Sequence, residues 1–486
     1  MSNSHPEYEQ HAKRVFRQKR IENWNRVVAK YDRSRSIGRC YHRLLARYYQ
    51  FLIPPDSRIL ELGCGSGELL TALKPSRGVG VDFSIEAIRR ARGEHPGLLF
   101  CVADAQEIPI NTRFDVIILS DLVNDLWDVQ KVIEELRPLC HARTRVIVNS
   151  YNNLWRIPLS IVKRLGLGAF LLEQNWLAPH DIVNLLKLGG FEVIKRWPRI
   201  LLPLQLAFLS TLANRYLVNL IPFNWFALTN IFIARPLPEE SNQIRSSNTD
   251  VSVIIPARNE SGNIDEIIRR TPDLGRYTEL IFVEGHSTDD TYAAIEQAKT
   301  RFPGRTIKLY RQTGHGKGDA VRLGFENAKG QILMILDADM TVPPEDLERF
   351  FDALITGKGD FINVVRLVYP LEDQAMRSMN ILGNKLFSLA FSWLLDQPIK
   401  DTLCGTKVLW KRDYQAVARN RHYFGDFDPF GDFDLLFGAA KLNLKIIELP
   451  IRYRSRRYGE TNIARWRHGW LLLKMVIFAA RRIKFI

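Results

Sequence analysis

The chain has 486 residues, more than one hydrophobic core usually supports, so its length favours two domains. Apolar residues make up 46% and charged residues 25%, a balance that excludes a disordered or fibrous protein. Lys and Arg (68) outnumber Asp and Glu (53), and the formal charge of +15 predicts attraction to nucleic acid, an anionic membrane surface or a phosphate-bearing substrate.

The cysteines and the first residues bear on the compartment. The cysteines are scattered and form no CxxC pair, which excludes a disulfide framework and a zinc site as predictions. Residues 1–14 are polar and lack the apolar stretch of a signal peptide. We therefore expect a cytoplasmic protein. The cysteines are Cys40, Cys64, Cys101, Cys140 and Cys404.

Short aliphatic runs alternate with longer amphipathic stretches on both sides of one polar segment. That segment, residues 236–250, is rich in Pro, Ser, Asn and charge, and predicts a linker. The alternation predicts an α/β fold with two doubly wound domains, residues 1–235 and residues 251–486, each with a largely parallel sheet.

The first candidate site is a glycine-rich turn. Residues 59–67 read ILELGCGSG, an apolar strand followed by Gly63, Gly65 and Gly67. Glycines at this spacing permit a tight turn from strand to helix and a close approach of the backbone to a ligand. Asp82 ends the next strand, GVGVD, where its carboxylate can accept hydrogen bonds from ribose hydroxyls.

Polar residues also follow the next two strands. Asp104 and Ala105 follow LLFCV, and Ser120 and Asp121 follow FDVIIL. Ligands of doubly wound sheets bind at the carboxyl ends of the strands, so these positions predict one shared nucleotide site.

Residues 36–235 resemble the class I S-adenosylmethionine-dependent methyltransferases. The resemblance implies a Rossmann-like fold and S-adenosylmethionine as cofactor. It also implies that Glu61 and the glycine turn contact the methionine portion, Asp82 the ribose, and Asp104 with Ala105 the adenine. The spacing of the glycines fits this family better than the GxGxxG of nicotinamide enzymes, which remain the alternative.

The methyl acceptor is not identified by any motif. Alignment does most of the work in methyl transfer, and a base is needed only for some acceptors. His180 is a candidate base, with a structural role at a helix start as the other interpretation. The apolar segment 200–223 is interpreted as a lid, a lipid-facing surface or part of the core.

The second candidate site combines acidic strand ends with a basic loop. VSVIIPARNE ends near Glu260, ELIFVE ends at Glu284, and the buried strand ILMIL is followed by Asp337 and Asp339. Two carboxylates one residue apart at a strand end suit a hard divalent cation that also binds a diphosphate. Lys317 lies in the intervening loop GHGKGD, near the phosphates or simply in solvent.

From Val251 nearly to its end, the chain resembles glycosyltransferase family 2, and within it the dolichol-phosphate mannosyltransferase-like group. The resemblance implies a GT-A fold and a nucleotide-sugar donor, with Asp337 and Asp339 as ligands of Mg²⁺ or Mn²⁺. Glu284 would meet the nucleoside, but the chain has Glu284-Gly285 where the family usually has paired Asp, which leaves the base open. The nucleotide pocket would be lined by Pro256, Ala257 and Glu260.

The resemblance also places an acceptor loop downstream, where Arg366 and Arg377 would hold a lipid phosphate. Asp401 and Asp434 are further acidic candidates, with helix capping or salt bridging as the structural interpretation. A polyprenyl phosphate can attack the anomeric carbon without a base, whereas a sugar hydroxyl needs one. Asp434 is the base predicted for that second case.

Residues 452–486 are strongly basic and enclose the apolar run WLLLKMVIFAA. This pattern predicts basic amphipathic C-terminal helices that lie in a membrane interface, and residues 381–395 are a second candidate for such a helix. Core packing is the alternative for both segments. The positive charge is therefore interpreted as affinity for an anionic membrane surface, and no nucleic-acid partner is expected.

Together these patterns predict a bifunctional transferase on the cytoplasmic face of a membrane. It would transfer a sugar from a nucleotide-sugar donor to a polyprenyl phosphate or glycolipid acceptor, and would methylate a related substrate. One alternative is a glycosyltransferase whose first half only binds S-adenosylmethionine or acts as a scaffold. Another is a soluble nucleic-acid methyltransferase.

Overall fold

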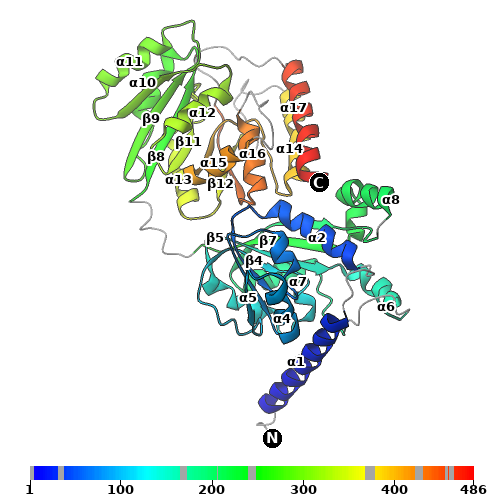
Figure 1. The fold of residues 1–486 in the computed structure, drawn as a ribbon. Coiled ribbons are helices and arrows are strands. Elements are labelled where there is room, and N and C mark those ends of the chain that lie inside the picture. The colour runs from blue at the N-terminus through cyan, green and yellow to red at the C-terminus, as the bar shows by residue number, and fades with distance from the viewer. Residues whose placement is uncertain are drawn as a thin grey trace. The chain divides into compact units, whose positions relative to one another are not determined.

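The structure is a computed structural model that describes residues 5–30, 38–164, 172–204, 206–238, 248–366, 378–421, 431–454, 458 and 465–486. The chain forms two compact units, which divide between Leu237 and Pro238. Each unit contains one seven-stranded sheet with helices beside it (Figure 1). The prediction of two mixed α/β domains is confirmed.

The first sheet has the strand order β3-β2-β1-β4-β5-β7-β6. The first five of these strands are parallel, and β7 is antiparallel to both of its neighbours. The order of the parallel strands reverses between β1 and β4, which is where doubly wound sheets bind ligands. The strands are β1 (Arg58–Leu62), β2 (Arg77–Asp82), β3 (Leu99–Val102), β4 (Phe114–Leu119), β5 (Cys140–Tyr151), β6 (Phe191–Arg199) and β7 (Thr229–Pro236).

The helices of the first unit begin at recognisable local signals. Ser84 caps α4 by accepting a hydrogen bond from the Ala87 N–H, and Asp128 caps α5 by accepting one from the Lys131 N–H. The α-helices are α1 (His5–Lys30), α2 (Gly38–Leu52), α3 (Glu68–Ala72), α4 (Ile85–Glu94), α5 (Val129–Glu135), α6 (Arg156–Arg164), α7 (Pro179–Leu188) and α8 (Ala207–Thr211). Shorter turns are η1 (Val123–Asp125), η2 (Arg137–Leu139), η3 (Asn153–Trp155), η4 (Leu212–Tyr216), η5 (Leu217–Asn219) and η6 (Phe223–Phe226).

The second sheet has the order β10-β9-β8-β11-β13-β12-β14. Strands β10, β9, β8 and β11 are parallel, and β13 is antiparallel to β11 and β12. The segment before β13 therefore lies at the carboxyl end of β11. The strands are β8 (Asp250–Ala257), β9 (Tyr277–Glu284), β10 (Thr306–Arg311), β11 (Ile332–Ile335), β12 (Phe361–Val365), β13 (Lys407–Trp410) and β14 (Ile446–Pro450).

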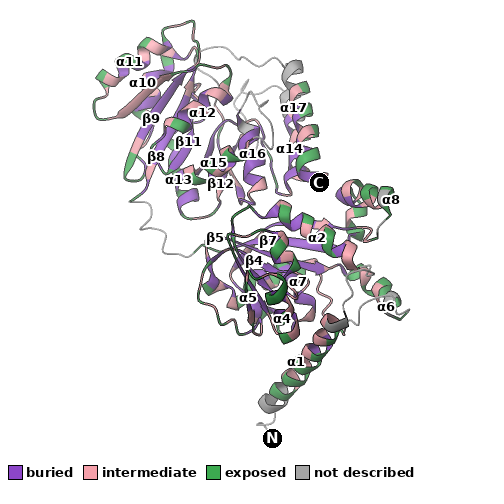
Figure 2. Ribbon diagram, in the orientation of Figure 1, coloured by how far each residue is buried: buried purple, intermediate pink, exposed green. Residues whose placement is uncertain are grey.

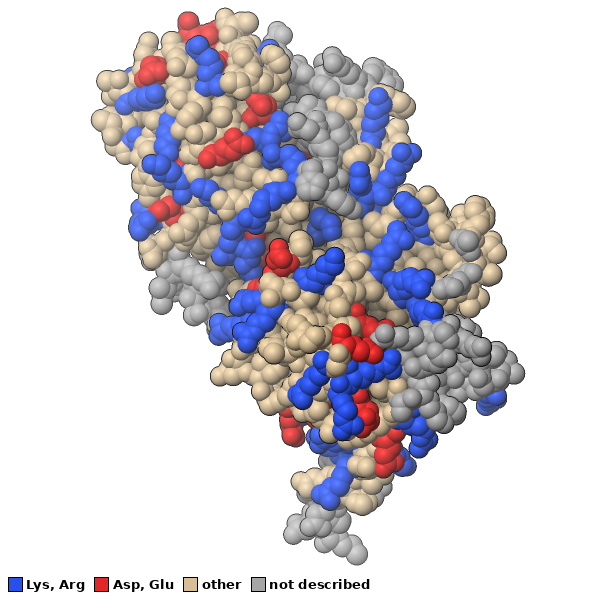
Figure 3. All heavy atoms as spheres, in the orientation of Figure 1, with Lys and Arg blue, Asp and Glu red and all other residues tan. Residues whose placement is uncertain are grey.

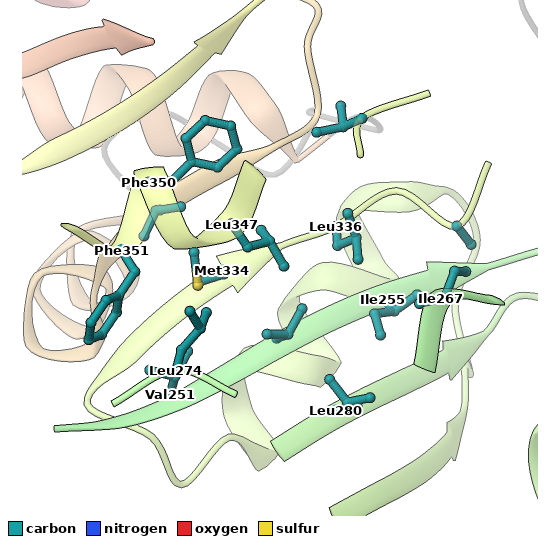
Figure 4. Packing of buried hydrophobic residues seen from close by; sticks show 14 of the residues in the cluster. Val251, Ile255, Ile267, Leu274, Leu280, Met334, Leu336, Leu347, Phe350 and Phe351 are labelled. Atoms are coloured by element: carbon teal, nitrogen blue, oxygen red, sulfur yellow. The ribbon is translucent and has the colours of Figure 1, made fainter. Parts of the chain in front are cut away.

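The central strands of the second sheet are mainly apolar and buried, as expected of a sheet that is covered on both faces. Figure 2 shows them as buried, and Figure 4 shows Val251 and Ile255 of β8 packed in one cluster with Met334 of β11 and Phe350 of α13. The α-helices are α10 (Ile264–Arg270), α11 (Thr291–Arg301), α12 (Lys317–Asn327), α13 (Leu347–Ile355), α14 (Ser378–Leu395), α15 (Lys411–Arg419), α16 (Asp432–Lys441) and α17 (Arg465–Ala479). Shorter turns are η8 (Ser261–Asn263), η9 (Pro344–Asp346) and η11 (Ala480–Lys484).

Both segments proposed from sequence as interface helices are helical. Residues 381–395 lie in α14, and the tail forms α17 and η11, which pack against α14. In the part of the chain that the structure describes, no helix is both long enough and apolar enough to cross a membrane. Whether these helices lie in a membrane interface stays a prediction.

Candidate active sites

The glycine turn after β1 has the conformation that its sequence requires. Gly63, Gly65 and Gly67 have φ values of 71°, 50° and 77°, where side chains are strained. A Cβ on Gly67 would lie 2.7 Å from Phe100, whereas a Cβ on Gly65 would meet nothing within 4 Å. The backbone at Gly65 therefore faces open space that a ligand can approach closely.

Asp82 holds this turn in place. Its Oδ2 accepts a hydrogen bond from the Gly65 N–H at 2.9 Å, and its Oδ1 accepts one from the Ser84 N–H at 2.8 Å. Burial raises the pKa of Asp82, although these two hydrogen bonds oppose the shift. Each carboxylate oxygen keeps a further lone pair, so Asp82 can still accept from ribose hydroxyls as predicted.

Glu61 is a buried carboxyl group at the foot of the same turn. It is 3% exposed, and its Oε2 has no hydrogen-bond partner among the described residues. Burial raises the pKa of Glu61 to about 8; a hydrogen bond from the Leu70 backbone opposes the shift, and the charge of Asp82 adds to it. An orphaned buried carboxyl group beside an open glycine turn fits a cationic ligand group.

The structure adds α1 to this site, which no sequence motif indicated. Arg17 lies 3.2 Å from the predicted adenine residue Asp104. Arg20 and the Trp24 indole N–H donate to Asp125, which ends η1 after β4, at 2.9 and 2.6 Å. The carboxyl ends of β3 and β4 are therefore joined to a helix that is distant in sequence and has no recognisable motif.

Asp121 belongs to a buried polar cluster at the carboxyl ends of β4 and β5. Its Oδ1 accepts hydrogen bonds from the Tyr41 hydroxyl at 2.7 Å and from Asn149 Nδ2 at 2.6 Å. Asn149 in turn accepts a hydrogen bond from the Tyr49 hydroxyl at 2.7 Å. Burial raises the pKa of Asp121, against the charge of His42 and these hydrogen bonds.

The other predicted residues of the first unit divide between interior and surface. Ala105 is 7% exposed, next to Asp104, which accepts a hydrogen bond from the Gln106 N–H at 2.9 Å. The His180 side chain is 85% exposed and lies 3.1 Å from its chain neighbour Asp181 at the start of α7. His180 thus has the surface position expected of the structural interpretation.

In the second unit, the ends of β8 and β9 are tied together. The Gly285 N–H donates to the Ala257 carbonyl at 2.9 Å, and Pro256 precedes Ala257 in β8. The Glu284 side chain, 3% exposed, accepts a hydrogen bond from the Ser287 N–H at 2.5 Å and shapes the turn after β9. The predicted nucleotide residues thus share one sheet edge.

Asn263 connects two predicted motifs. Its side-chain N–H groups donate to Glu260 Oε2 at 2.7 Å and to the Ala338 carbonyl at 3.1 Å. The Asn therefore fixes Glu260 against the backbone between Asp337 and Asp339. Sequence reasoning missed Asn263, because its contact with the Ala338 carbonyl joins segments that are 75 residues apart.

The centre of the second site is an ion pair between Lys317 and Asp337. The Lys317 Nζ lies 2.5 Å from Asp337 Oδ1. Gly316, with a φ of 87°, places Lys317 as the first residue of α12. A Cβ on Gly405 would lie 1.6 Å from Nζ and 2.5 Å from Asp337 Oδ2, so a larger residue there would displace both side chains. The antiparallel strand β13 brings Gly405 to this edge, which sequence alone did not indicate.

Asp339 is the second predicted carboxylate and lies two residues after Asp337. Its Oδ1 accepts hydrogen bonds from the Thr341 hydroxyl at 2.7 Å and from the Thr341 N–H at 3.2 Å. Among the described residues, no three His, Cys, Asp or Glu side chains are grouped as a metal site. That Asp337 and Asp339 hold a divalent cation stays a prediction.

Arg366 and Asp401 face each other rather than standing apart. The Arg366 Nε donates to Asp401 Oδ2 at 2.7 Å and its Nη2 to Oδ1 at 2.8 Å, and Asn384 adds a third side-chain contact at 3.1 Å. Asp401 is 0% exposed. Asp401 thus forms a salt bridge with Arg366. Arg377, the other predicted acceptor arginine, lies outside the described residues.

Asp434, the predicted base, lies on α16. It is 8% exposed, and its Oδ2 accepts a hydrogen bond from Arg421 Nε at 2.9 Å. The glycine that precedes α16, Gly431, packs against Gly318 of α12. Asp434 is thus on a helix adjacent to the one that carries Lys317, and its role stays a prediction.

Comparisons with known proteins cover both units. Residues 252–414 match "Glycosyl transferase family 2", and residues 53–180 match "Methyltransferase domain". An undecaprenyl-phosphate 4-deoxy-4-formamido-L-arabinose transferase from Edwardsiella ictaluri is 30% identical over 215 residues, 43% of this chain and 62% of the relative. Glycosyltransferase AglJ from Haloferax volcanii is 26% identical over 224 residues, 46% of this chain and 69% of the relative. The chain thus spans under two thirds of the length of the first of these relatives.

Solved structures include both kinds of enzyme. A glucosyl-3-phosphoglycerate synthase from Mycobacterium tuberculosis aligns with 49% of this chain and 81% of its own, at 18% identity and a TM-score of 0.36. A magnesium protoporphyrin IX methyltransferase from Synechocystis aligns with 47% and 98%, at 16% identity and a TM-score of 0.32. The first unit thus matches the sequence model of a methyltransferase domain, and the second unit matches that of glycosyl transferase family 2.

Proposed function

We propose that the second unit transfers a sugar from a nucleotide-diphosphate donor to a polyprenyl phosphate or a related glycolipid, and that the first unit methylates a related substrate with S-adenosylmethionine. The observation that carries the sugar transfer is the ion pair of Lys317 and Asp337 beside Gly405, after the end of β11, with Asp339 two residues further along the chain. The names of the undecaprenyl-phosphate sugar transferases among the relatives support a lipid phosphate as acceptor.

Mg²⁺ or Mn²⁺ fits the carboxylates of Asp337 and Asp339. The donor set is all oxygen and too small to hold the ion without a diphosphate, as expected of a cation that binds together with the donor. When bound, the cation would neutralise charge on the leaving nucleotide diphosphate. Lys317 would leave its ion pair with Asp337 and bind a diphosphate oxygen of the donor instead. Glu260 would orient the nucleotide.

Sugar transfer then requires little from a base if the acceptor is a phosphate. The acceptor oxygen forms a bond to the anomeric carbon while the bond from that carbon to the nucleotide diphosphate breaks. An ionised phosphate has no proton to lose, whereas a hydroxyl acceptor would pass its proton to a carboxylate. Asp434 is the proposed base in that case: its Oδ2 accepts a hydrogen bond from Arg421, whereas both carboxylate oxygens of Asp401 accept from the Arg366 side chain.

For methyl transfer, the ionised Glu61 would bind the positively charged amino group of S-adenosylmethionine, and Asp82 the ribose hydroxyls. The orphaned Oε2 of Glu61 and the open space at Gly65 support this fit. When bound, S-adenosylmethionine would supply a methyl group carried on a positively charged sulfur. The buried polar cluster around Asp121 lies at the same sheet edge and would orient the acceptor.

Peripheral membrane association is part of the proposal. On α17, Trp470, Leu473 and Ile477 are 61%, 41% and 48% exposed, and Leu386 and Leu389 of α14 are 61% and 70% exposed. Lys474 lies over the Trp470 ring, and Arg481 and Arg482 follow on the surface. Exposed apolar side chains beside basic ones support contact with an anionic membrane interface.

The test is release of nucleotide diphosphate from a panel of nucleotide-sugars, with Mg²⁺ or Mn²⁺ and polyprenyl phosphate in anionic liposomes. We expect metal-dependent release with one donor and its loss in Asp339→Ala. The matched control is Asp352→Ala, an exposed position on α13, which should keep full activity. Full activity of Asp339→Ala would show that the carboxylate pair is not the donor site.

A further inference from the structure

The first unit carries a surface of exposed apolar side chains, formed by residues 153–164 and 206–226 and here called the α6–α8 surface. Phe208 is 77% exposed, Ile157 and Ile221 are 71%, and Trp225 is 60%. Single exposed apolar residues are ordinary, but a contiguous group of large ones marks an interaction site. Figure 2 shows α6 and α8 mainly as exposed or intermediate.

The two segments of this surface are joined to each other. The Trp155 indole N–H donates to the Phe226 carbonyl at 2.9 Å. Asn152 Nδ2 donates to the carbonyls of Trp225 at 2.8 Å and Ala227 at 3.0 Å. The apolar residues of η3, α6 and η6 therefore form one surface.

Buried amide side chains lie beside the exposed apolar ones in this region. Asn152, Asn214 and Asn219 are 8%, 5% and 6% exposed, Val218 is buried, and Phe208 and Ile221 are 77% and 71% exposed. Asn214 accepts hydrogen bonds from the backbone N–H groups of residues 201 and 202, and Asn219 accepts one from Arg199 at 2.7 Å. Buried amides that fix the backbone while large apolar groups point outward suit an apolar surrounding medium.

The charge of this region identifies that medium. The sequence has no Asp or Glu in residues 136–172 or 193–238, whereas Arg156 and Arg164 at the two ends of α6 are exposed. Figure 3 shows no acidic side chain over α8. Exposed aromatic and aliphatic side chains with basic neighbours and no acids match the interface of an anionic lipid bilayer.

The position of the surface ties it to the methyltransferase site. Segment 153–164 follows β5, and segment 206–226 connects β6 to β7, where Tyr151 pairs with Thr229. Both segments thus leave the sheet at its carboxyl edge, the edge of the glycine turn. Asn149, two residues before Tyr151, contacts Asp121.

We propose that the α6–α8 surface docks the methyltransferase unit on an anionic lipid bilayer. If the first unit transfers a methyl group as proposed above, the methyl acceptor is part of a lipid and enters from the bilayer beside Asp121. This surface acts in addition to the helices of the second unit.

The test measures binding of the purified full-length protein to vesicles of phosphatidylcholine with and without phosphatidylglycerol. Phe208→Glu and Leu209→Glu should each weaken binding to the anionic vesicles about tenfold, because apolar contact is lost and a like charge faces the lipid. The control is Leu188→Glu: Leu188 is 59% exposed, as Leu209 is 55%, but ends α7 at the opposite edge of the sheet. It should bind as the wild type does.

Trp470→Glu, on α17, measures separately how much the second unit contributes to vesicle binding. If Phe208→Glu weakens binding equally in the wild type and in Trp470→Glu, the two surfaces act independently. Wild-type binding by both Phe208→Glu and Leu209→Glu would overturn the inference, as would self-association of the chain that these variants abolish without any change in vesicle binding. Nucleotide diphosphate release and S-adenosylmethionine binding are measured on the same samples in detergent. Failure of those activities would count against the proposed function and leave the docking result standing.

Discussion

Lys317 Nζ lies 2.5 Å from Asp337 Oδ1, and Gly405 lies so close to this ion pair that a Cβ at this position would displace both side chains. The three residues come from the start of α12, the end of β11 and the segment before β13. A cation and a carboxylate paired under a bare backbone leave a place where a diphosphate can replace one partner. The first prediction follows from this contact.

Gly405→Ala should lower donor turnover at least tenfold while the protein stays folded. The new methyl group would lie 1.6 Å from Lys317 Nζ and 2.5 Å from Asp337 Oδ2, so both side chains must move. The measurement is nucleotide diphosphate release together with thermal unfolding. Gly304→Ala is the matched control, since a Cβ there meets nothing within 4 Å. Equal turnover in the two variants would remove the ion pair from the donor site.

S-adenosylmethionine should bind more tightly as pH rises towards 8. Burial raises the pKa of Glu61 to about 8, so the free protein holds this carboxyl group protonated at neutral pH, whereas a cationic ligand favours the ionised form. Binding therefore releases a proton, and affinity should rise about tenfold per pH unit below that pKa. Titration calorimetry in buffers of different ionisation enthalpy measures the release.

Glu61→Gln should bind the cofactor more weakly and without this pH dependence, while Glu134→Gln on α5 should behave as the wild type. Stability gives a second readout. Between the pKa of an unfolded Glu, about 4.3, and about 8, native Glu61 holds a proton that the unfolded chain has lost. The free energy of unfolding of the wild type should therefore fall across this window as pH rises. An equal fall in Glu61→Gln would assign the effect to another group.

Trp24 should report cofactor binding. Its indole N–H donates to Asp125 at 2.6 Å, at the carboxyl edge where the cofactor would bind, and Arg17 of the same helix reaches Asp104. S-adenosylmethionine should change the tryptophan fluorescence of the wild type and of Trp410→Phe, and the change should be largely lost in Trp24→Phe. An undiminished signal from Trp24→Phe would mean that α1 does not respond to the cofactor.

The sequence was sufficient for the fold class because apolar runs alternate with amphipathic stretches in both units, and several of these runs are followed by polar residues. Glycines 63, 65 and 67 adopt the positive φ values that their spacing suggested. The strand-end carboxylates of each unit lie along one sheet edge, since parallel strands place their carboxyl ends together. These features depend on the local sequence pattern and can therefore be predicted from the sequence.

What escaped prediction depends on contacts between distant segments. Trp24 meets Asp125 across 101 positions, and Gly405 reaches Lys317 only because β13 runs antiparallel to β11. A short sequence motif encodes neither the direction of a strand such as β13 nor the packing of a distant helix such as α1. The exposed apolar surface was left open between lid, lipid contact and core, because hydropathy alone does not say which side of a segment faces outward.

The last prediction concerns the Arg366–Asp401 pair, which joins β12 to the segment before β13. Burial alone would raise the pKa of Asp401, but the charge of Arg366 and the hydrogen bonds from Arg366 and Asn384 outweigh it and hold the pKa well below its ordinary value. Asp401→Asn leaves the guanidinium buried without its counter-charge and should cost about 3–5 kcal/mol of unfolding free energy at pH 7. The exposed pair of Arg276 and Asp250 provides the control, and Asp250→Asn should change stability little.

The pH dependence gives the sign. Because the pKa of Asp401 is lowered on folding, its stabilising contribution is present above the pKa of an unfolded Asp, about 3.9, and is lost as pH falls below it. The stability difference between wild type and Asp401→Asn should therefore shrink in acid. Arg366→Lys distinguishes a structural role from acceptor binding. If Arg366 also contacts the lipid phosphate, the KM for the acceptor should rise in this variant even under conditions where the protein stays folded. A variant that loses stability alone would restrict Arg366 to holding the sheet edge together.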